Sequence, residues 1–175
     1  VLGPLKQMGL QILDDGKETL PLTVRGSGDL LPIEYALPVP SAQVKSAILI
    51  AGLMAKGETT VIEKEATRDH TERMLRGFGY AVKTEGARIS LRGGGMLKAC
   101  NIDVPADISS ATFFLVGASI APGSDLVLEH VGINPTRIGV INILRLMSAD
   151  LVVENAREVG GEQVADLRVR GGKLK

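Results

Sequence analysis

The sequence lacks tryptophan, and aromatic side chains make up only 3% of its 175 residues. Proteins that bind single-stranded nucleic acid use aromatic side chains as stacking surfaces, and most nucleic-acid binders carry a basic face. Here 20 basic residues are balanced by 20 acidic ones, and the basic residues gather on no identifiable face. We therefore expect no nucleic-acid partner.

Cysteine occurs once, at Cys100, so an internal disulfide is excluded and a reducing compartment is expected. Neither Cys100 nor the histidines His70 and His130 stand at metal-ligand spacing, so no metal site is expected. No apolar run reaches the length of a membrane span, and we expect no signal peptide. We expect a cytoplasmic protein with no membrane partner.

The hydrophobic residues, 45% of the chain, are enough for a real core in one domain or two small ones. The longest apolar run, Ala47–Ala55, follows the polar stretch Ser41–Ser46, and Lys56 and Gly57 then supply a helix stop. Because apolar residues occupy nearly every position of the run, we predict a helix that is buried on all sides.

The amino end of this predicted helix is the part that can face a ligand. Its free N–H groups and partial positive charge suit an anion. Ser41 can add a hydroxyl, Gln43 an amide and Lys45 a positive charge. Ser41 can equally serve as a simple helix cap, which is the commonest role of serine at such a position. The residues alone leave both interpretations open.

A second polar stretch, Thr67–Arg73, begins another predicted helix. Arg68 precedes that helix and keeps its charge at any physiological pH, so it is a candidate for binding a phosphate or stacking on a ring. The alternative is a pair of ordinary helix ion pairs, in which Arg68 binds Glu72 and Asp69 binds Arg73.

Similar stretches recur further along the chain. Asp107–Ser110 stands in the position of Ser41 ahead of an apolar helix, and Asn134–Arg137 stands in the position of Thr67–Arg68. Asp107–Ser110 could form a second anion site, but a plain aspartate or serine cap explains it fully. For Asn134–Arg137 a structural role is favoured, because proline suits a rigid entry to a helix.

These recurrences belong to a repeat of about 65 to 70 residues. Its order is strand, helix, strand, helix, strand, strand, which indicates an α/β protein. The chain begins near the end of a second helix, so we expect it to be a fragment. A polar, glycine-rich stretch precedes Ile102–Pro105, and there we predict a boundary between domains at 1–101 and 102–175. The predicted strands are Leu10–Leu13, Thr19–Val24, Thr59–Glu63, Tyr80–Lys83, Arg88–Leu91, Asp125–Glu129, Asp150–Val153 and Asp166–Val169, and Asp14–Glu18 is predicted to form a hairpin turn.

Several common site motifs are missing. Gly26-Ser27-Gly28 lacks the third glycine of a dinucleotide-binding loop. Ser41 lacks the flanking glycines of a nucleophile elbow, which argues against a serine hydrolase built on Ser41 and His70. No phosphate-binding loop sequence is present.

Taken together, Ser41–Ala47, Thr67–Leu75, Asp107 with Ser109–Ala111, and Asn134–Arg137 resemble the 5-enolpyruvylshikimate-3-phosphate synthase family, particularly its glyphosate-insensitive bacterial class. The resemblance covers nearly the whole chain, in order. It implies βαβαββ units of an inside-out α/β barrel, incomplete here at both ends. The repeat found from the residues alone agrees with this fold. Three positions depart from the family pattern, which suggests a divergent member. Ala106 stands where the family has glycine, and Pro40 and Ile138 also differ.

The resemblance also implies a function. The family transfers the enolpyruvyl group of phosphoenolpyruvate to the 5-hydroxyl of shikimate-3-phosphate, with no metal or organic cofactor. Ser41 and the backbone of Ala42 would bind the phosphate of shikimate-3-phosphate, Gln43 would reach both substrates, and Arg68 would lie against shikimate-3-phosphate. The role of Lys45 stays open. The family's catalytic residues fall outside this sequence, so the fragment is expected to be inactive.

Two alternatives remain. One is an enolpyruvyl transferase with another acceptor, such as UDP-N-acetylglucosamine, and the other is a non-catalytic α/β module that binds an anion or a partner protein. The exposure of Gln43 distinguishes them, because a substrate site needs Gln43 in an open crevice. The full-length enzyme is expected to be a monomer, whereas the exposed edges of the fragment predict self-association.

Overall fold

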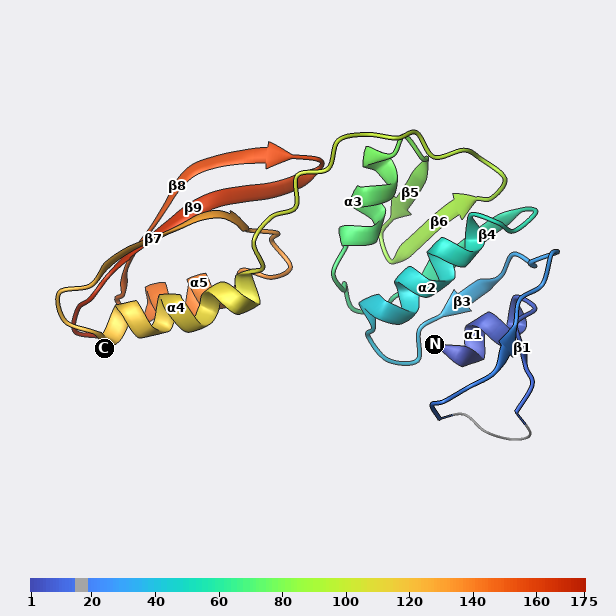
Figure 1. Cartoon of the computed structure of the whole chain (residues 1–175), viewed down its shortest axis with the longest axis horizontal. Coiled ribbons are helices and arrows are strands. Elements are labelled where there is room, and N and C mark those ends of the chain that lie inside the picture. The colour runs from blue at the N-terminus through green and yellow to red at the C-terminus, as the bar shows by residue number, and fades with distance from the viewer. Residues whose placement is uncertain (15–18) are drawn as a thin grey trace. The chain divides into compact units, whose positions relative to one another are not determined.

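The chain, a computed structural model that describes residues 1–14 and 19–175, divides into two compact units, Val1–Ala99 and Cys100–Lys175 (Figure 1). Each unit has its own hydrophobic core. No helix in the described ranges is long and apolar enough to cross a membrane.

The first unit is built on a four-stranded sheet in the order β3-β4-β6-β5. β3 and β4 are parallel and joined by the crossover helix α2, whereas the other neighbours are antiparallel. From β3 onward the order is strand, helix, strand, helix, strand, strand, as predicted. The elements are α1 (Leu2–Gln7), β1 (Gln11–Ile12), β2 (Val24–Arg25), β3 (Glu34–Ala36), α2 (Ala42–Gly52), β4 (Glu58–Ile62), α3 (His70–Gly77), β5 (Val82–Glu85) and β6 (Arg88–Arg92).

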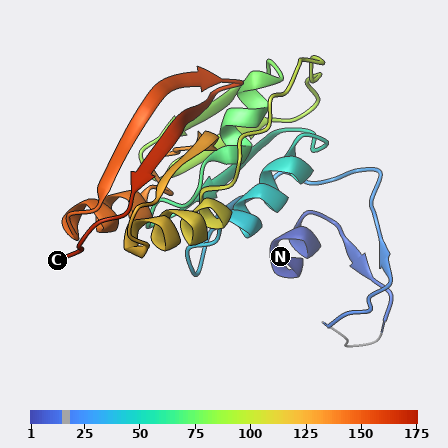
Figure 2. The ribbon, with the colours of Figure 1, turned by 60° about the vertical axis from the view of Figure 1, so that its left-hand side comes forward.

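Alternation of burial along β6 shows which face of this sheet carries the core. Val61 and Ile89, which are register partners, are both buried, together with Leu91. They join Ile48 of α2 and Leu75 of α3 in one apolar cluster, so both helices cover the same face of the sheet. The ribbon of β1 and β2 extends away from this sheet (Figure 2).

The second unit repeats the same order with a shorter beginning. Its antiparallel sheet has the order β7-β9-β8, and α4 and α5, drawn in yellow and orange, cover one face of it (Figure 2). The first strand of the repeat is reduced to one parallel bridge, Ala106 with Val131. The elements are α4 (Ile108–Ile120), β7 (Asp125–Gly132), α5 (Gly139–Leu146), β8 (Asp150–Val159) and β9 (Glu162–Arg170).

The end of each repeat is hydrogen-bonded to its first helix region. The Gly94 N–H, just after β6, donates to the carbonyl oxygen of Leu53 at 2.9 Å, and the Gly172 N–H, just after β9, donates to that of Ser119 at 3.1 Å. Equivalent residues therefore make the same contact in both units, which supports the repeat independently of its strands.

Several predicted boundaries shift. β1 and β2 pair antiparallel, as predicted for a hairpin, but β2 contains only Val24 and Arg25. Residues 15–18 of the predicted turn Asp14–Glu18 lie outside the described part of the chain. β8 and β9 are longer than predicted, since β8 continues to Val159 and β9 begins at Glu162.

The prediction that α2 is buried on all sides is wrong for this chain. One side of the helix packs against α1, β4 and β6 and contacts α3 through Lys45 and Ser46, whereas the Ile50 side chain is 49% exposed. The helix also ends at Gly52, before the predicted stop at Lys56 and Gly57, because the turn that follows tightens into hydrogen bonds between residues three apart.

Candidate functional site

The amino end of α2 is capped by Ser41. The Ser41 backbone is extended, and its Oγ accepts a hydrogen bond from the Val44 N–H at 3.3 Å. The cap satisfies one of the free N–H groups of the first turn and leaves others available. Capping is thus one role of Ser41, and its hydroxyl hydrogen can still be donated elsewhere.

A cavity of about 350 Å³ lies beside this helix end. It is lined by Ala42, Gln43, Ser46, Arg68, His70 and Thr71. Three of the four predicted site residues, Ala42, Gln43 and Arg68, thus line one cavity, whereas Ser41 does not line it but caps the adjoining helix. Gln43 is exposed, as a substrate site in an open crevice requires. A purely structural glutamine was expected to be buried.

The two alternatives for the segment before α3 have different outcomes. Arg73 and Asp69 form the predicted ion pair at 2.9 Å. The predicted pair between Arg68 and Glu72 is wrong, because Glu72 binds Lys45 instead, with Nζ to Oε1 at 2.7 Å. Arg68 is exposed, and its guanidinium has no ion-pair or hydrogen-bond partner in the part of the chain that the structure describes.

Lys45 does not offer its charge to the cavity. It is fully buried, and its Nζ lies 3.2 Å from Glu63 and 2.7 Å from Glu72. The reason is helical spacing, since Lys45 falls on the same face as Ile48 and Leu49, which pack into the core. The positive charges at this site are therefore Arg68 and the helix end.

Three lining residues were missed by the sequence analysis as site candidates. Ser46 of α2 and Thr71 of α3 share a hydrogen bond between their hydroxyl oxygens at 2.6 Å, which joins the two helices under the cavity. His70 begins α3 directly after Arg68 and Asp69. The sequence could have identified them by position, because each lies within one helical turn of a predicted site residue.

The second unit contains the equivalent helix start without an open anion site. Asp107 caps α4 by accepting from the Ser109 N–H at 3.1 Å, and Arg137 donates to the Asp107 carboxylate at 3.4 Å and also contacts the Ser109 hydroxyl. The Ser109 N–H, assisted by the Arg137 charge, lowers the pKa of Asp107. The cap interpretation therefore accounts for Asp107–Ser110.

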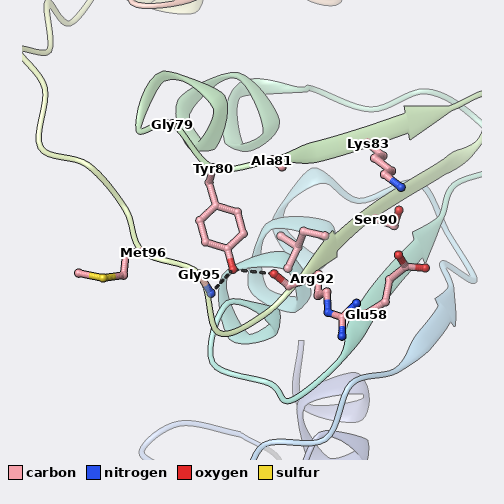
Figure 3. Close-up of a pocket in the computed structure, with 10 residues that line it drawn as sticks. Glu58, Gly79, Tyr80, Ala81, Lys83, Ser90, Arg92, Gly95 and Met96 are labelled. Carbon is pink, nitrogen blue, oxygen red and sulfur yellow. Dashed lines mark hydrogen bonds between the residues drawn. The ribbon is translucent and has the colours of Figure 1, made fainter.

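A separate cavity of about 410 Å³ lies at the ends of β5 and β6 in the first unit (Figure 3). Tyr80 closes one side of it, with its hydroxyl donating to the Arg92 carbonyl at 2.7 Å and accepting from the Gly95 N–H at 3.1 Å. Glu58 and Arg92, which are register partners, and Lys83 give it charges of both signs. None of the predicted site residues lines it.

Within the described ranges, no group of three or more histidine, cysteine or acidic residues is placed to hold a metal ion. Cys100 is exposed and unpaired.

The family described as EPSP synthase (3-phosphoshikimate 1-carboxyvinyltransferase) matches residues 1–175. The chain belongs to this family. A 3-phosphoshikimate 1-carboxyvinyltransferase from Alkalilimnicola ehrlichii is 65% identical over 175 residues, and one from Hydrogenovibrio crunogenus is 58% identical over 182 residues. The match takes in 100% of this chain but only 39% and 40% of those relatives.

Solved structures agree with the assignment to the EPSP synthase family. The EPSP synthase of Acinetobacter baumannii superposes with a TM-score of 0.85 at 61% identity, over 95% of this chain and 38% of that protein. The enolpyruvyl transferase NikO from Streptomyces tendae superposes with a TM-score of 0.72 over 99% of this chain and 42% of NikO. Because its identity is 14%, NikO supports the fold alone. The predicted α/β fold with βαβαββ repeats is confirmed, although the described sheets stay open and form no closed barrel.

Proposed function

We propose that this chain is the part of a 3-phosphoshikimate 1-carboxyvinyltransferase that binds shikimate-3-phosphate. The whole enzyme would transfer the enolpyruvyl group of phosphoenolpyruvate to the 5-hydroxyl of shikimate-3-phosphate and release phosphate, in aromatic amino acid biosynthesis. The names of the relatives support the reaction, and the cavity beside α2 supports the choice of substrate.

One internal comparison carries the proposal for the cavity. In the second unit Arg137 reaches the start of α4 and pairs with the carboxylate of the cap, Asp107. In the first unit the equivalent cap is the neutral Ser41, and Arg68 has no anionic partner among the described residues. The same arrangement of helix end and arginine therefore binds a carboxylate of the chain in the second unit and leaves the arginine available for a ligand anion in the first.

The chemistry of the lining suits a phosphorylated, hydroxyl-bearing ring. We assign the phosphate to the Ser41 hydroxyl and the Ala42 N–H, at the positive end of α2. Gln43 would use its amide, which both donates and accepts, on the ring hydroxyls and on phosphoenolpyruvate. Arg68 would lie against the same ligand and neutralise charge.

We assign the chemical step to parts of the relatives that this chain does not cover, since it spans about two fifths of their length. Proton transfer and neutralisation of phosphoenolpyruvate need acids, bases and cations beyond those around the cavity. In this proposal, residues 1–101 belong to the shikimate-3-phosphate-binding domain and 102–175 begin a second domain. We also propose a cytoplasmic location and a reaction without metal or organic cofactor.

A calorimetric titration of shikimate-3-phosphate into the chain tests the proposal. We expect saturable binding that Arg68→Ala weakens by about tenfold to a hundredfold, the range for one charged hydrogen bond, with smaller losses for Gln43→Ala and Ser41→Ala. Arg92→Ala, at the other cavity, is the matched control and should leave the affinity unchanged.

Three other outcomes contradict the proposal. Weakening by Arg92→Ala but not by Arg68→Ala would move the ligand to the cavity of Figure 3. Tighter binding of UDP-N-acetylglucosamine would favour the alternative acceptor. Binding of neither compound would favour a non-catalytic module.

A further inference from the structure

We infer that Lys45 is a positioning residue: through Glu63 and Thr67 it holds Arg68 in register with the start of α2. The inference rests on the proposed function, because it concerns the same cavity. It starts from a buried group that ligand binding does not use, since Lys45 is fully buried and faces away from the cavity.

A continuous chain of contacts links Lys45 to Arg68. Lys45 Nζ lies 3.3 Å from Glu63 Oε1 and 3.2 Å from Glu63 Oε2. Glu63 Oε2 in turn accepts hydrogen bonds from Thr67 Oγ1 at 2.7 Å and from the Thr67 N–H at 3.2 Å. Thr67 is covalently joined to Arg68. The second partner of Lys45, Glu72, lies on α3, which begins two residues after Arg68.

Stability of the fold alone does not account for this buried charge cluster. Burying three charged groups is costly, and an apolar trio of similar volume is often as stable. In the second unit two of these three charges are replaced by apolar residues, since Ala111 and Ile141 stand at the repeat positions of Lys45 and Glu72 and are both buried. Moreover, Glu72 Oε2 is buried without a hydrogen-bond partner among the described residues.

The two units differ in how the arginine segment is attached to its helix. In the second unit Arg137 itself bonds to the start of α4, and Thr136 is held locally by Asn134 at 2.8 Å and 2.9 Å. In the first unit Arg68 has to stay available for a ligand. The segment is instead attached to α2 by the preceding residue, Thr67, which bonds to Glu63, which in turn contacts Lys45.

Thr67→Val tests the link most directly, because it removes one hydrogen bond of a half-buried side chain and leaves the charges in place. We expect the Kd for shikimate-3-phosphate to rise by about tenfold while the variant still unfolds in one cooperative urea transition, and Thr67→Ser to restore the affinity. Thr136→Val, the equivalent change in the second unit, is the matched control and should not alter the Kd.

A double variant separates positioning from a direct or purely structural role. If Thr67 acts through Arg68, then Thr67→Val should cause no further loss in an Arg68→Ala background. An unchanged Kd in Thr67→Val, or an equal loss in both backgrounds, would overturn the inference even where Arg68→Ala weakens binding and so supports the proposed function.

A ligand-free measurement decides the inference if the wild-type chain does not bind shikimate-3-phosphate, which would count against the proposed function only. In ¹⁵N relaxation, the order parameters of Thr67 and Arg68 should be near 0.85 in the wild type and fall below about 0.6 in Thr67→Val and Glu63→Gln. Equal order parameters in wild type and variants would overturn the inference.

Discussion

Lys45 on α2 and Glu72 on α3 form an ion pair of 2.7 Å with 0% and 3% of their side chains exposed. Two helices of the first unit are thus joined by charge inside an apolar core. Glu63 shares the same Lys45 ammonium, so one cation serves two buried carboxylates.

Removing the cation should destabilise the chain strongly. Lys45→Met keeps most of the side-chain volume but leaves Glu63 and Glu72 buried without a counter-charge, which costs about 3 to 5 kcal/mol of unfolding free energy. Urea denaturation measures the change. Lys56→Met, which breaks the exposed pair of Lys56 with Asp29, is the control and should cost less than about 1 kcal/mol. Equal effects of the two changes would contradict the buried-pair assignment.

Gly93 and Gly171 should tolerate no side chain. A Cβ atom on Gly93 would overlap the carbonyl oxygens of Gly52 and Ala55, and one on Gly171 would overlap that of Ala121. Because backbone has to move in either case, we expect Gly93→Ala and Gly171→Ala each to lower the unfolding free energy by about 3 kcal/mol. Gly172→Ala, where the space is open, should change it by less than about 0.5 kcal/mol, and a similar loss there would contradict the steric explanation.

Asp125 should make the second unit sensitive to acid. Arg168 donates two hydrogen bonds to its carboxylate at 2.8 Å and 2.6 Å and, with the charge of Arg170, lowers the Asp125 pKa from its ordinary value of 3.8 to about 2. A folded-state pKa below the unfolded one gives stability that is complete above about pH 4 and is lost as the pH falls through about 2.

Asp125→Asn isolates this effect. Its unfolding free energy should be lower than that of the wild type at pH 7, and the difference should shrink between pH 4 and pH 2. Chemical denaturation across this pH range measures it. Arg168→Gln should reproduce the result, and a difference that is constant with pH would show that the carboxylate does not titrate with folding.

The Tyr80 hydroxyl should stabilise the loop after β6. It donates to the Arg92 carbonyl and accepts from the Gly95 N–H, so Tyr80→Phe leaves both groups without this partner. We expect a loss of about 1 to 2 kcal/mol in thermal or urea unfolding. Tyr35→Phe is the matched control, because the Tyr35 hydroxyl has no hydrogen-bond partner within the described ranges. Equal losses would show that the bonds of Tyr80 contribute nothing.

Helix α4 should mediate self-association of the chain. Phe113, Val116 and Ile120 lie on one side of it and are 79%, 39% and 61% exposed. Such a stripe is buried when two copies meet. Light scattering should give a mass that rises with concentration, and Phe113→Ser with Ile120→Ser should reduce the rise. A monodisperse monomer at every concentration would contradict this prediction.

The parts of the fold that the sequence predicts correctly are those fixed by local chemistry. Ser41 and Asp107 both cap helices because a short oxygen-bearing side chain ahead of an apolar run satisfies a free N–H group wherever it occurs. Strands β4, β6 and β7 begin where the sequence predicted them, to within one residue.

The parts that it predicts wrongly depend on distant partners. An ion pair of Arg68 with Glu72 on the helix surface would contribute only a few tenths of a kcal/mol to stability. Burying the Glu72 carboxylate without a counter-charge would cost far more, and Lys45 supplies that charge from another helix. Strand β8 continues beyond Val153 because β9 pairs with it, although the residues added are mostly polar and show no alternation of burial.

Of the candidate site, the sequence locates the helix end and the arginine but not which groups share a cavity. Ser46 and Thr71 meet only because α2 and α3 cover the same face of the sheet. Lys45 is the opposite case. Its place in a polar stretch suggested a ligand contact, but the turn of the helix directs its side chain into the core.

The amides of Gly94 and Gly172 connect the last residues of each repeat to its first helix region, so neither amide can reach water unless that closure opens. In hydrogen exchange they would therefore act as two native reporters, one in each unit. If the two units open together as one cooperative folding unit, the two exchange rates should be equal. Different rates would mean that each repeat unfolds independently and that its stability can be measured without the other.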